Sequence, residues 1–142
     1  MNEFQERLNE LILENNLNRL NLAKTIGISS TTINGYFNNN YYPTLDIAIK
    51  LCKYFHCSLD YLFGLSDFKL NANSNNKSFI ENIDHLLQIN NLSISKFLKD
   101  LQMSEYNYYR WKNLQTPKTG NLVVIANYFG VGLDFLVGNV NK

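Results

Sequence analysis

The chain has 142 residues, of which 45% are hydrophobic, and it carries a formal net charge of +1. This length allows one ordinary domain or two small ones, and no apolar run approaches the ~20 residues that a membrane-spanning helix needs. The polar N-terminus predicts no secretion signal. The presence of only two cysteines excludes a disulfide framework, so we expect a cytoplasmic protein.

The first half of the chain predicts five short helices and no strands. Apolar residues recur at helical spacing in the first helix, at Phe4, Leu8, Leu11 and Ile12. Residues suited to begin a helix stand at Asn18, Ser29, Pro43-Thr44 and Ser58. Residues suited to end one stand at Asn15-Asn16, Gly27 and Gly64. These signals predict helices over 19–26 and 30–37, joined by a tight turn.

The second half repeats this plan. FQERLNELILENNL (4–17) aligns with FIENIDHLLQINNL (79–92) at an offset of 75, and LCKYFHCSLDYLFG (51–64) aligns with IANYFGVGLDFLVG (125–138) at an offset of 74. A repeat of this length is a whole small domain. The prediction is therefore an all-α protein of two tandem five-helix domains, 1–66 and 78–142, joined by a polar linker over 67–77.

Two short helices joined by a glycine turn, the second capped by serine, form a helix-turn-helix arrangement. The stretch LNRLNLAKTIGISSTTINGYFNNNYYPTLD, followed by SLDYLFG, resembles the Cro/phage-repressor-like helix-turn-helix family of xenobiotic-response-element-like transcriptional regulators. The resemblance covers 3–66 well and 78–138 less closely. It implies sequence-specific binding to double-stranded DNA and, most often, transcriptional repression of phage or mobile-element type.

The candidate DNA-binding residues lie in and around the second helix of this motif. A helix in the major groove presents its first two turns to base edges, here Ser30, Thr31, Thr32, Asn34 and Gly35, while Ile33 and Tyr36 face the core. The resemblance implies a phosphate contact by Arg19. The capping residue Ser29 is a further candidate. The residues after the helix could donate to phosphates: Asn38, Asn39, Asn40, Tyr41 and Tyr42. The alternative for 30–35 is an ordinary solvated helix face.

The second copy departs from the family pattern. Gln102 stands where the first copy has Gly27, and a Cβ there is strained if φ is positive. Ile94 stands in place of Arg19. The matching helix over 105–111 predicts a second DNA contact or a protein contact, since tyrosine and arginine suit both; its candidate residues are Glu105, Tyr106, Asn107, Tyr109, Arg110 and Lys112. Trp111 is predicted to lie in the core.

Charge and polarity differ between the two halves. Residues 1–68 hold five Lys/Arg against seven Asp/Glu, a net of −2, and residues 69–142 hold eight against five, a net of +3. Gln5, Glu14, Arg19 and Lys50 of the first copy correspond to Ile80, Ile89, Ile94 and Val124. Since exposed apolar patches mark contacts, these four predict a homodimer, an inter-domain pseudo-dimer or another protein partner for residues 78–142. The alternative function is a protein-binding module, an antirepressor or inhibitor with little DNA affinity.

Enzymatic or metal chemistry is not predicted. Cys52, His56 and Cys57 cluster without a fourth ligand nearby, which falls short of a closed zinc site, so the cysteines are predicted to lie in the core. His85 is interpreted as a surface residue. The sequence offers no phosphate-binding glycine loop and no nucleophile–base pair. We therefore expect no cofactor and no catalytic residues.

Overall fold

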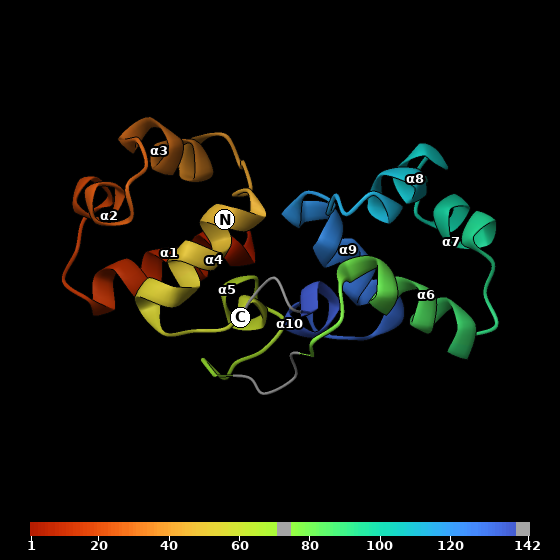
Figure 1. The fold of residues 1–142 in the computed structure, drawn as a ribbon. Helices are drawn as coiled ribbons and strands as arrows, with labels where there is room; N and C mark the ends of the chain where they lie inside the picture. The colour runs from red at the N-terminus through yellow and green to blue at the C-terminus, as the bar shows by residue number, and fades with distance from the viewer. Residues whose placement is uncertain (71–74, 139–142) are drawn as a thin grey trace. The chain divides into compact units, whose positions relative to one another are not determined.

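The computed structural model of the protein describes residues 1–70 and 75–138, which contain helices and no strand. The chain divides into two compact units, Met1–Asn71 and Ala72–Lys142. The first unit holds α1 (Glu3–Glu14), α2 (Arg19–Ile26), α3 (Ser30–Asn38), α4 (Leu45–Phe55) and α5 (Leu59–Leu62) (Figure 1). The second holds α6 (Phe79–Ile89), α7 (Ile94–Asp100), α8 (Tyr106–Lys112), α9 (Thr119–Phe129) and α10 (Leu133–Val137). The predicted all-α class is confirmed.

Short polar side chains begin the helices of the first unit where the sequence predicts. Asn18 accepts a hydrogen bond of 2.7 Å from the backbone N–H three residues ahead, and Ser29 accepts one of 3.1 Å in the same way. Thr44 and Ser58 cap α4 and α5 with the same geometry. Each cap pairs an N–H group that has no partner inside its helix, so local chemistry determines these boundaries.

Residues with positive φ end several helices in both units. Asn16 follows α1 with φ 56° and Gly27 follows α2 with φ 76°. The matching residue after α7 is Gln102, with φ 56°. The strained turn predicted there is confirmed, because a residue with a Cβ pays about 1 kcal/mol for a left-handed backbone.

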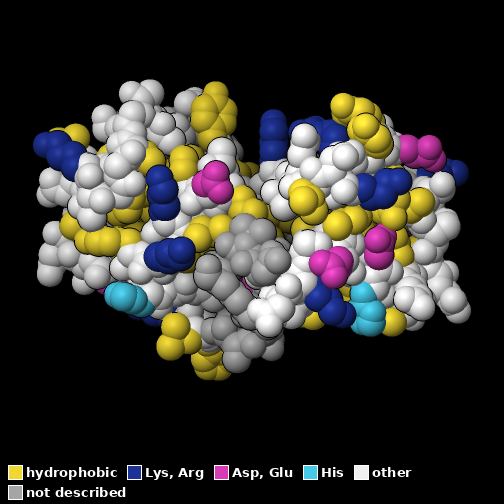
Figure 2. Space-filling model, in the orientation of Figure 1, with side chains coloured by type: hydrophobic (Ala, Val, Ile, Leu, Met, Phe, Trp, Pro, Cys, Tyr) yellow, Lys and Arg dark blue, Asp and Glu magenta, His cyan; other side chains and the backbone are white. Residues whose placement is uncertain are grey.

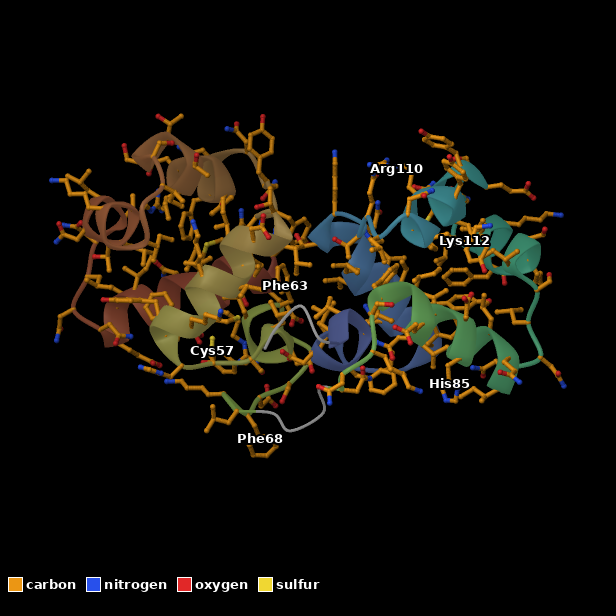
Figure 3. All side chains as sticks on the ribbon, viewed as in Figure 1. Cys57, Phe63, Phe68, His85, Arg110 and Lys112 are labelled. Atoms are coloured by element: carbon orange, nitrogen blue, oxygen red, sulfur yellow. The ribbon has the colours of Figure 1, made fainter. Side chains whose placement is uncertain are left out.

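All five helices contribute to the core of the first unit. Its fully buried side chains include Phe4, Leu8, Leu11, Leu22, Ile33, Leu51, Leu59 and Leu62. Helix α1 packs against α5, and α2 packs against α3 and α4. Cys52 and Cys57 are buried, which confirms their predicted place in the core, and Figure 3 labels Cys57 on the turn between α4 and α5. His56, between them, is exposed.

The second unit has its own core, in which α10 packs against α6 and α9. Trp111 is 2% exposed and meets Phe79 edge-on with ring centroids 5.3 Å apart, so its predicted core position is confirmed. The buried amide of Asn82 donates hydrogen bonds to the backbone oxygens of Phe135 and Leu136, at 3.1 and 3.2 Å. This side chain therefore ties α6 to α10.

The predicted linker over 67–77 is more closely attached to the units than its composition suggests. Asp67 pairs with Arg7 at 2.9 Å, and Lys69 pairs with Glu14 at 2.7 Å. The backbone N–H of Ser58 also donates to the oxygen of Lys69 at 2.7 Å. On the other side, Asn75 bonds Asn82 and the oxygen of Phe135. Residues 71–74 of the predicted linker lie outside the described residues.

The helices of the two described ranges are short, and the longest has 12 residues. No helix in them is long and apolar enough to cross a bilayer.

Candidate nucleic-acid interface

Helices α2 and α3 form the helix-turn-helix pair predicted from the sequence. They are joined by Gly27, which caps the C-terminus of α2, and by Ser29, which caps the N-terminus of α3. The hydroxyl groups of Ser29 and Thr32 lie 2.8 Å apart in a further hydrogen bond. The first turn of α3 is therefore fixed by side-chain contacts as well as by its backbone.

The outward side of α3 is polar and uncharged. Ser29, Thr31, Asn38 and Asn39 are exposed, while Ser30, Thr32 and Asn34 are partly buried. The surface over α3 is drawn mostly in white, the colour of the backbone and of side chains that are neither hydrophobic nor charged (Figure 2). Hydroxyl and amide groups of this kind can hydrogen-bond base edges and phosphate oxygens. The inward positions Ile33 and Tyr36 are 0% and 3% exposed, which confirms that they belong to the core.

Gly35 does not lie open on this surface as the sequence predicts. It is buried, because the ring of Tyr41 covers it. A Cβ added at Gly35 would lie 3.1 Å from Cδ2 of that ring. The helical period of α3 places residue 35 correctly on the outward side, but it cannot reveal that the chain folds back over it.

Arg19 makes a contact that its role in the family does not imply. Its guanidinium carbon lies 3.9 Å from the centre of the Phe37 ring, in a cation–π arrangement that joins the start of α2 to α3. Stacking occupies the flat face of a guanidinium and leaves its N–H groups directed outward in the plane. Arg19 thus remains chemically able to donate to a phosphate, which is the contact predicted for it.

Sequence reasoning missed the part played by Gln5. The prediction takes Gln5 as one of four polar counterparts of apolar residues, yet it is 1% exposed and completely hydrogen-bonded. Its Oε1 accepts from the N–H of Asn2 at 2.7 Å, and its Nε2 donates to the oxygen of Tyr36 at 2.6 Å and to Oδ1 of Asn40 at 2.8 Å. Its spacing from Leu8 and Ile12 places it in the apolar stripe of α1, and this signal could have identified a buried amide.

The negative charge of the first half lies outside the helix-turn-helix segment. Residues 18–43 contain Arg19 and Lys24 and no Asp or Glu. Four of the acidic residues are exposed on α1, at Glu3, Glu6, Glu10 and Glu14. The net of −2 therefore does not describe the α3 surface, although few cations are available there to neutralise phosphates.

Helix α8 of the second unit presents a different surface. The rings of Tyr106 and Tyr109, which are 65% and 59% exposed, stack with centroids 5.9 Å apart. Arg110 and Lys112 extend from the same helix (Figure 3). Nε of Arg110 donates to Gln115 at 2.8 Å, and Nζ of Lys112 lies 5.0 Å from the centre of the Tyr108 ring.

The two remaining candidates, Glu105 just before α8 and Asn107 on it, are partly engaged with neighbouring residues. Glu105 is exposed and accepts a hydrogen bond of 3.3 Å from the hydroxyl of Ser95. Asn107 is partly buried and its amide donates to the oxygen of Ser104 at 3.1 Å. The outward aromatic pair and the two cations are therefore the groups that α8 offers to a partner.

The four apolar interface candidates do not form one patch. Ile89 and Val124 are 63% and 45% exposed, whereas Ile80 and Ile94 are partly buried. Ile80 and Ile89 are nine residues apart on α6, which places them half a turn out of phase on opposite sides of the helix. Of these four, only Ile89 and Val124 offer substantial apolar surface to a partner.

Burial perturbs one titratable group next to the candidate interface. Burial raises the pKa of the Tyr36 phenol to about 12 from its usual 10.0. Its hydroxyl has no hydrogen-bond partner among the described residues. Among the described residues, no three His, Cys, Asp or Glu side chains lie together in a way that could hold a metal ion.

Comparison with known proteins identifies the first unit. Residues 8–62 match the model of the helix-turn-helix family and form a helix-turn-helix domain of the Cro/phage-repressor type. This match covers α2, the turn and α3, and it indicates DNA binding by this part of the chain. No curated protein and no solved structure matches the chain significantly.

Proposed function

We propose that the protein is a cytoplasmic, sequence-specific regulator of transcription that binds double-stranded DNA, a repressor of phage or mobile-element type. The observation that carries this proposal is the α2–turn–α3 pair, whose outward side holds hydroxyl and amide groups without opposing acidic residues. In this proposal α3 enters the major groove with Ser30, Thr31, Thr32 and Asn34 toward the bases.

Phosphate contacts surround this base-reading surface. Arg19, supported by Phe37, is the proposed cationic contact. Ser29, Asn38 and Asn39 add uncharged donors at the two ends of α3. With so few cations, binding should have a shallow dependence on salt concentration, because few counterions are released.

The experiment is selection of duplexes from a random DNA pool with the full chain at low and moderate salt. We expect a consensus sequence that is recovered at both salts. The Thr31→Ala/Asn34→Ala variant should lose that consensus, whereas Asn127→Ala, an exposed substitution on α9, should keep it. Failure to enrich any sequence at either salt would overturn the proposal and favour a function in protein binding.

For the second unit, we propose a divergent copy of the first that adds another contact through α8. The stacked, exposed Tyr106 and Tyr109 beside Arg110 support a recognition surface. Replacing both tyrosines with alanine in the full chain distinguishes a DNA partner from a second copy of the chain. A shortened footprint on the selected DNA would indicate a second half-site, and a lower mass in solution would indicate a homodimer.

We also propose that the exposed apolar residues Ile89 and Val124 of the second unit form a contact between two copies of the chain. Ile89→Gln/Val124→Lys should lower the mass in solution from dimer to monomer, because charged and polar groups are disfavoured at a buried contact. Leu13→Gln, at a similarly exposed apolar residue of the first unit, is the control. An unchanged mass for the double variant would exclude this surface as the dimer contact.

A further inference from the structure

The loop between α3 and α4 is held on both sides of Tyr41. On one side, Oδ1 of Asn40 accepts the 2.8 Å hydrogen bond from the buried amide of Gln5, and Asn40 itself has φ 56°. On the other side, the ring of Tyr42 lies 6.1 Å from those of both Phe4 and Phe63, between centroids. The backbone of Tyr41 is therefore fixed by its two neighbours.

The ring of Tyr41 is exposed and lies against Gly35. It is 61% exposed, while its Cδ2 and Cε2 atoms lie 3.1 and 3.7 Å from the position that a Cβ of residue 35 would occupy. Gly35 lies inside α3, where glycine is about 1 kcal/mol less favourable than alanine. The close approach of Tyr41 gives a physical reason for this unfavourable helix residue.

Gly35 also locates Tyr41 relative to the candidate DNA surface. Residue 35 follows Thr31 by four positions, so it lies one turn further along the same side of α3. The Tyr41 ring accordingly lies beside the outward polar residues, toward the C-terminal end of the helix. In a groove-bound helix this end is nearer to the sugar-phosphate backbone than the N-terminal turn is.

We propose that Tyr41 binds the DNA backbone by donating its hydroxyl hydrogen to a phosphate oxygen. Gly35, which lacks a Cβ, leaves the space that the Tyr41 ring needs to adopt this position. This inference rests on the proposed DNA-binding function and adds a contact to it. Gly35 is then a positioning residue, not a base-reading one. The donor carries no charge and the phosphate is the same in every sequence, so the contact should strengthen binding to all duplexes without changing the salt dependence.

The test measures the dissociation constants of full-length variants on the selected duplex and on a shuffled duplex of the same composition. Tyr41→Phe keeps the ring and removes the donor. It should weaken binding to both duplexes by the same factor, about 10- to 100-fold, as expected for one hydrogen bond to a charged phosphate oxygen. Tyr54→Phe, on α4 and 38% exposed, is the matched control and should leave both constants unchanged.

A second variant tests the contact between Gly35 and the Tyr41 ring. Gly35→Ala should weaken binding while leaving the urea midpoint equal or higher, because alanine favours the helix and disturbs only the Tyr41 ring. In a Tyr41→Ala background, Gly35→Ala should cause no further loss of affinity. If Gly35 has a purely structural role, Gly35→Ala should instead lower the urea midpoint. That result would overturn the assignment of Gly35 as a residue that positions Tyr41.

The remaining outcomes separate this inference from the proposed function. Unchanged binding by both Tyr41→Phe and Gly35→Ala would overturn the inference while DNA binding stands. A loss confined to the selected duplex would overturn the phosphate contact in favour of a base contact. If the unsubstituted chain binds neither duplex, the proposed function fails, and the inference fails with it.

Discussion

The side-chain amide of Gln5 in α1 donates a hydrogen bond of 2.6 Å to the backbone oxygen of Tyr36 near the end of α3. The same nitrogen also donates to Asn40 in the following loop. A single buried side chain thus connects the first helix of the unit to the helix that carries the candidate DNA surface. Both the stability of the unit and the position of α3 should depend on it.

Replacing Gln5 with leucine should lower the free energy of unfolding by about 1–3 kcal/mol. The volume is nearly kept, but the oxygens of Tyr36 and Asn40 lose their donor in a buried place. Urea unfolding of the full chain measures the change, with Glu6→Ala on the exposed side of α1 as control. A midpoint that matches the control would show that water replaces the amide at no cost.

Replacing Tyr36 with phenylalanine should raise the free energy of unfolding by about 1 kcal/mol. The hydroxyl is buried without a partner among the described residues, so its desolvation is uncompensated. The ring would keep its edge-on contact with Phe4, at 5.6 Å between centroids. Thermal or urea unfolding tests this, and a loss of stability would mean that the hydroxyl is hydrogen-bonded in solution.

The same tyrosine should make the first unit sensitive to alkaline pH. The folded state holds the phenol proton to about pH 12, whereas an unfolded tyrosine releases it near the ordinary value of 10.0. Ionisation of this group therefore does not affect stability below pH 10, and stability is lost as pH rises from 10 toward 12, by up to about 1.4 kcal/mol per pH unit. Stability measured from pH 9 to 11.5 should fall less steeply for Tyr36→Phe, and parallel curves would contradict the assignment.

The turns after α2 and α7 allow a reciprocal pair of substitutions. Gln102→Gly should stabilise the second unit by about 1 kcal/mol, because glycine adopts positive φ without strain. Gly27→Gln should destabilise the first unit by a similar amount, since no atom lies within 4 Å of an added Cβ and only the backbone conformation is strained. Equal urea midpoints for Gln102→Gly and the unsubstituted chain would contradict this account.

Arg19 should contribute one phosphate contact. Arg19→Ala is expected to weaken binding to selected and shuffled duplexes alike and to reduce the slope of log K against log salt by about 1. Phe37→Leu, which removes the stacked ring but keeps the charge, should cost less affinity and preserve the slope. Dissociation constants at four salt concentrations measure both, with Lys53→Ala on α4 as the control; a slope unchanged by Arg19→Ala would exclude the contact.

Local signals explain which parts of this fold the sequence predicts well. Ser29 and Asn18 mark helix starts because a capping side chain bonds its own backbone three residues away. The positive φ of Gln102 follows from its alignment with Gly27, and Trp111 follows from its helical phase. In each case the signal lies within a few residues along the chain or in the segment of the other half that aligns with it.

The features that sequence reasoning missed depend on residues distant in the chain or on a loop that folds back. Gln5 bonds Tyr36, which lies 31 positions further along the chain. A glutamine within an apolar stripe predicts a buried amide but does not indicate which residue it bonds. The cover that Tyr41 places over Gly35 depends on the path of the α3–α4 loop, which has no periodic pattern. The candidate site is thus predicted in its helix but not in the contacts that hold that helix.

The first unit has no lysine or arginine between Ser29 and Ile49, and this bears on how such a regulator would be distributed along a genome. A surface that releases few counterions is held weakly by arbitrary DNA, so the many non-specific sites of a chromosome compete poorly for it. Under the proposed function, and where the more basic second unit contacts protein and not DNA, most copies would be either free or at the operator, and few would be bound elsewhere on the chromosome. Occupancy of the operator would then follow the number of copies in the cell almost directly.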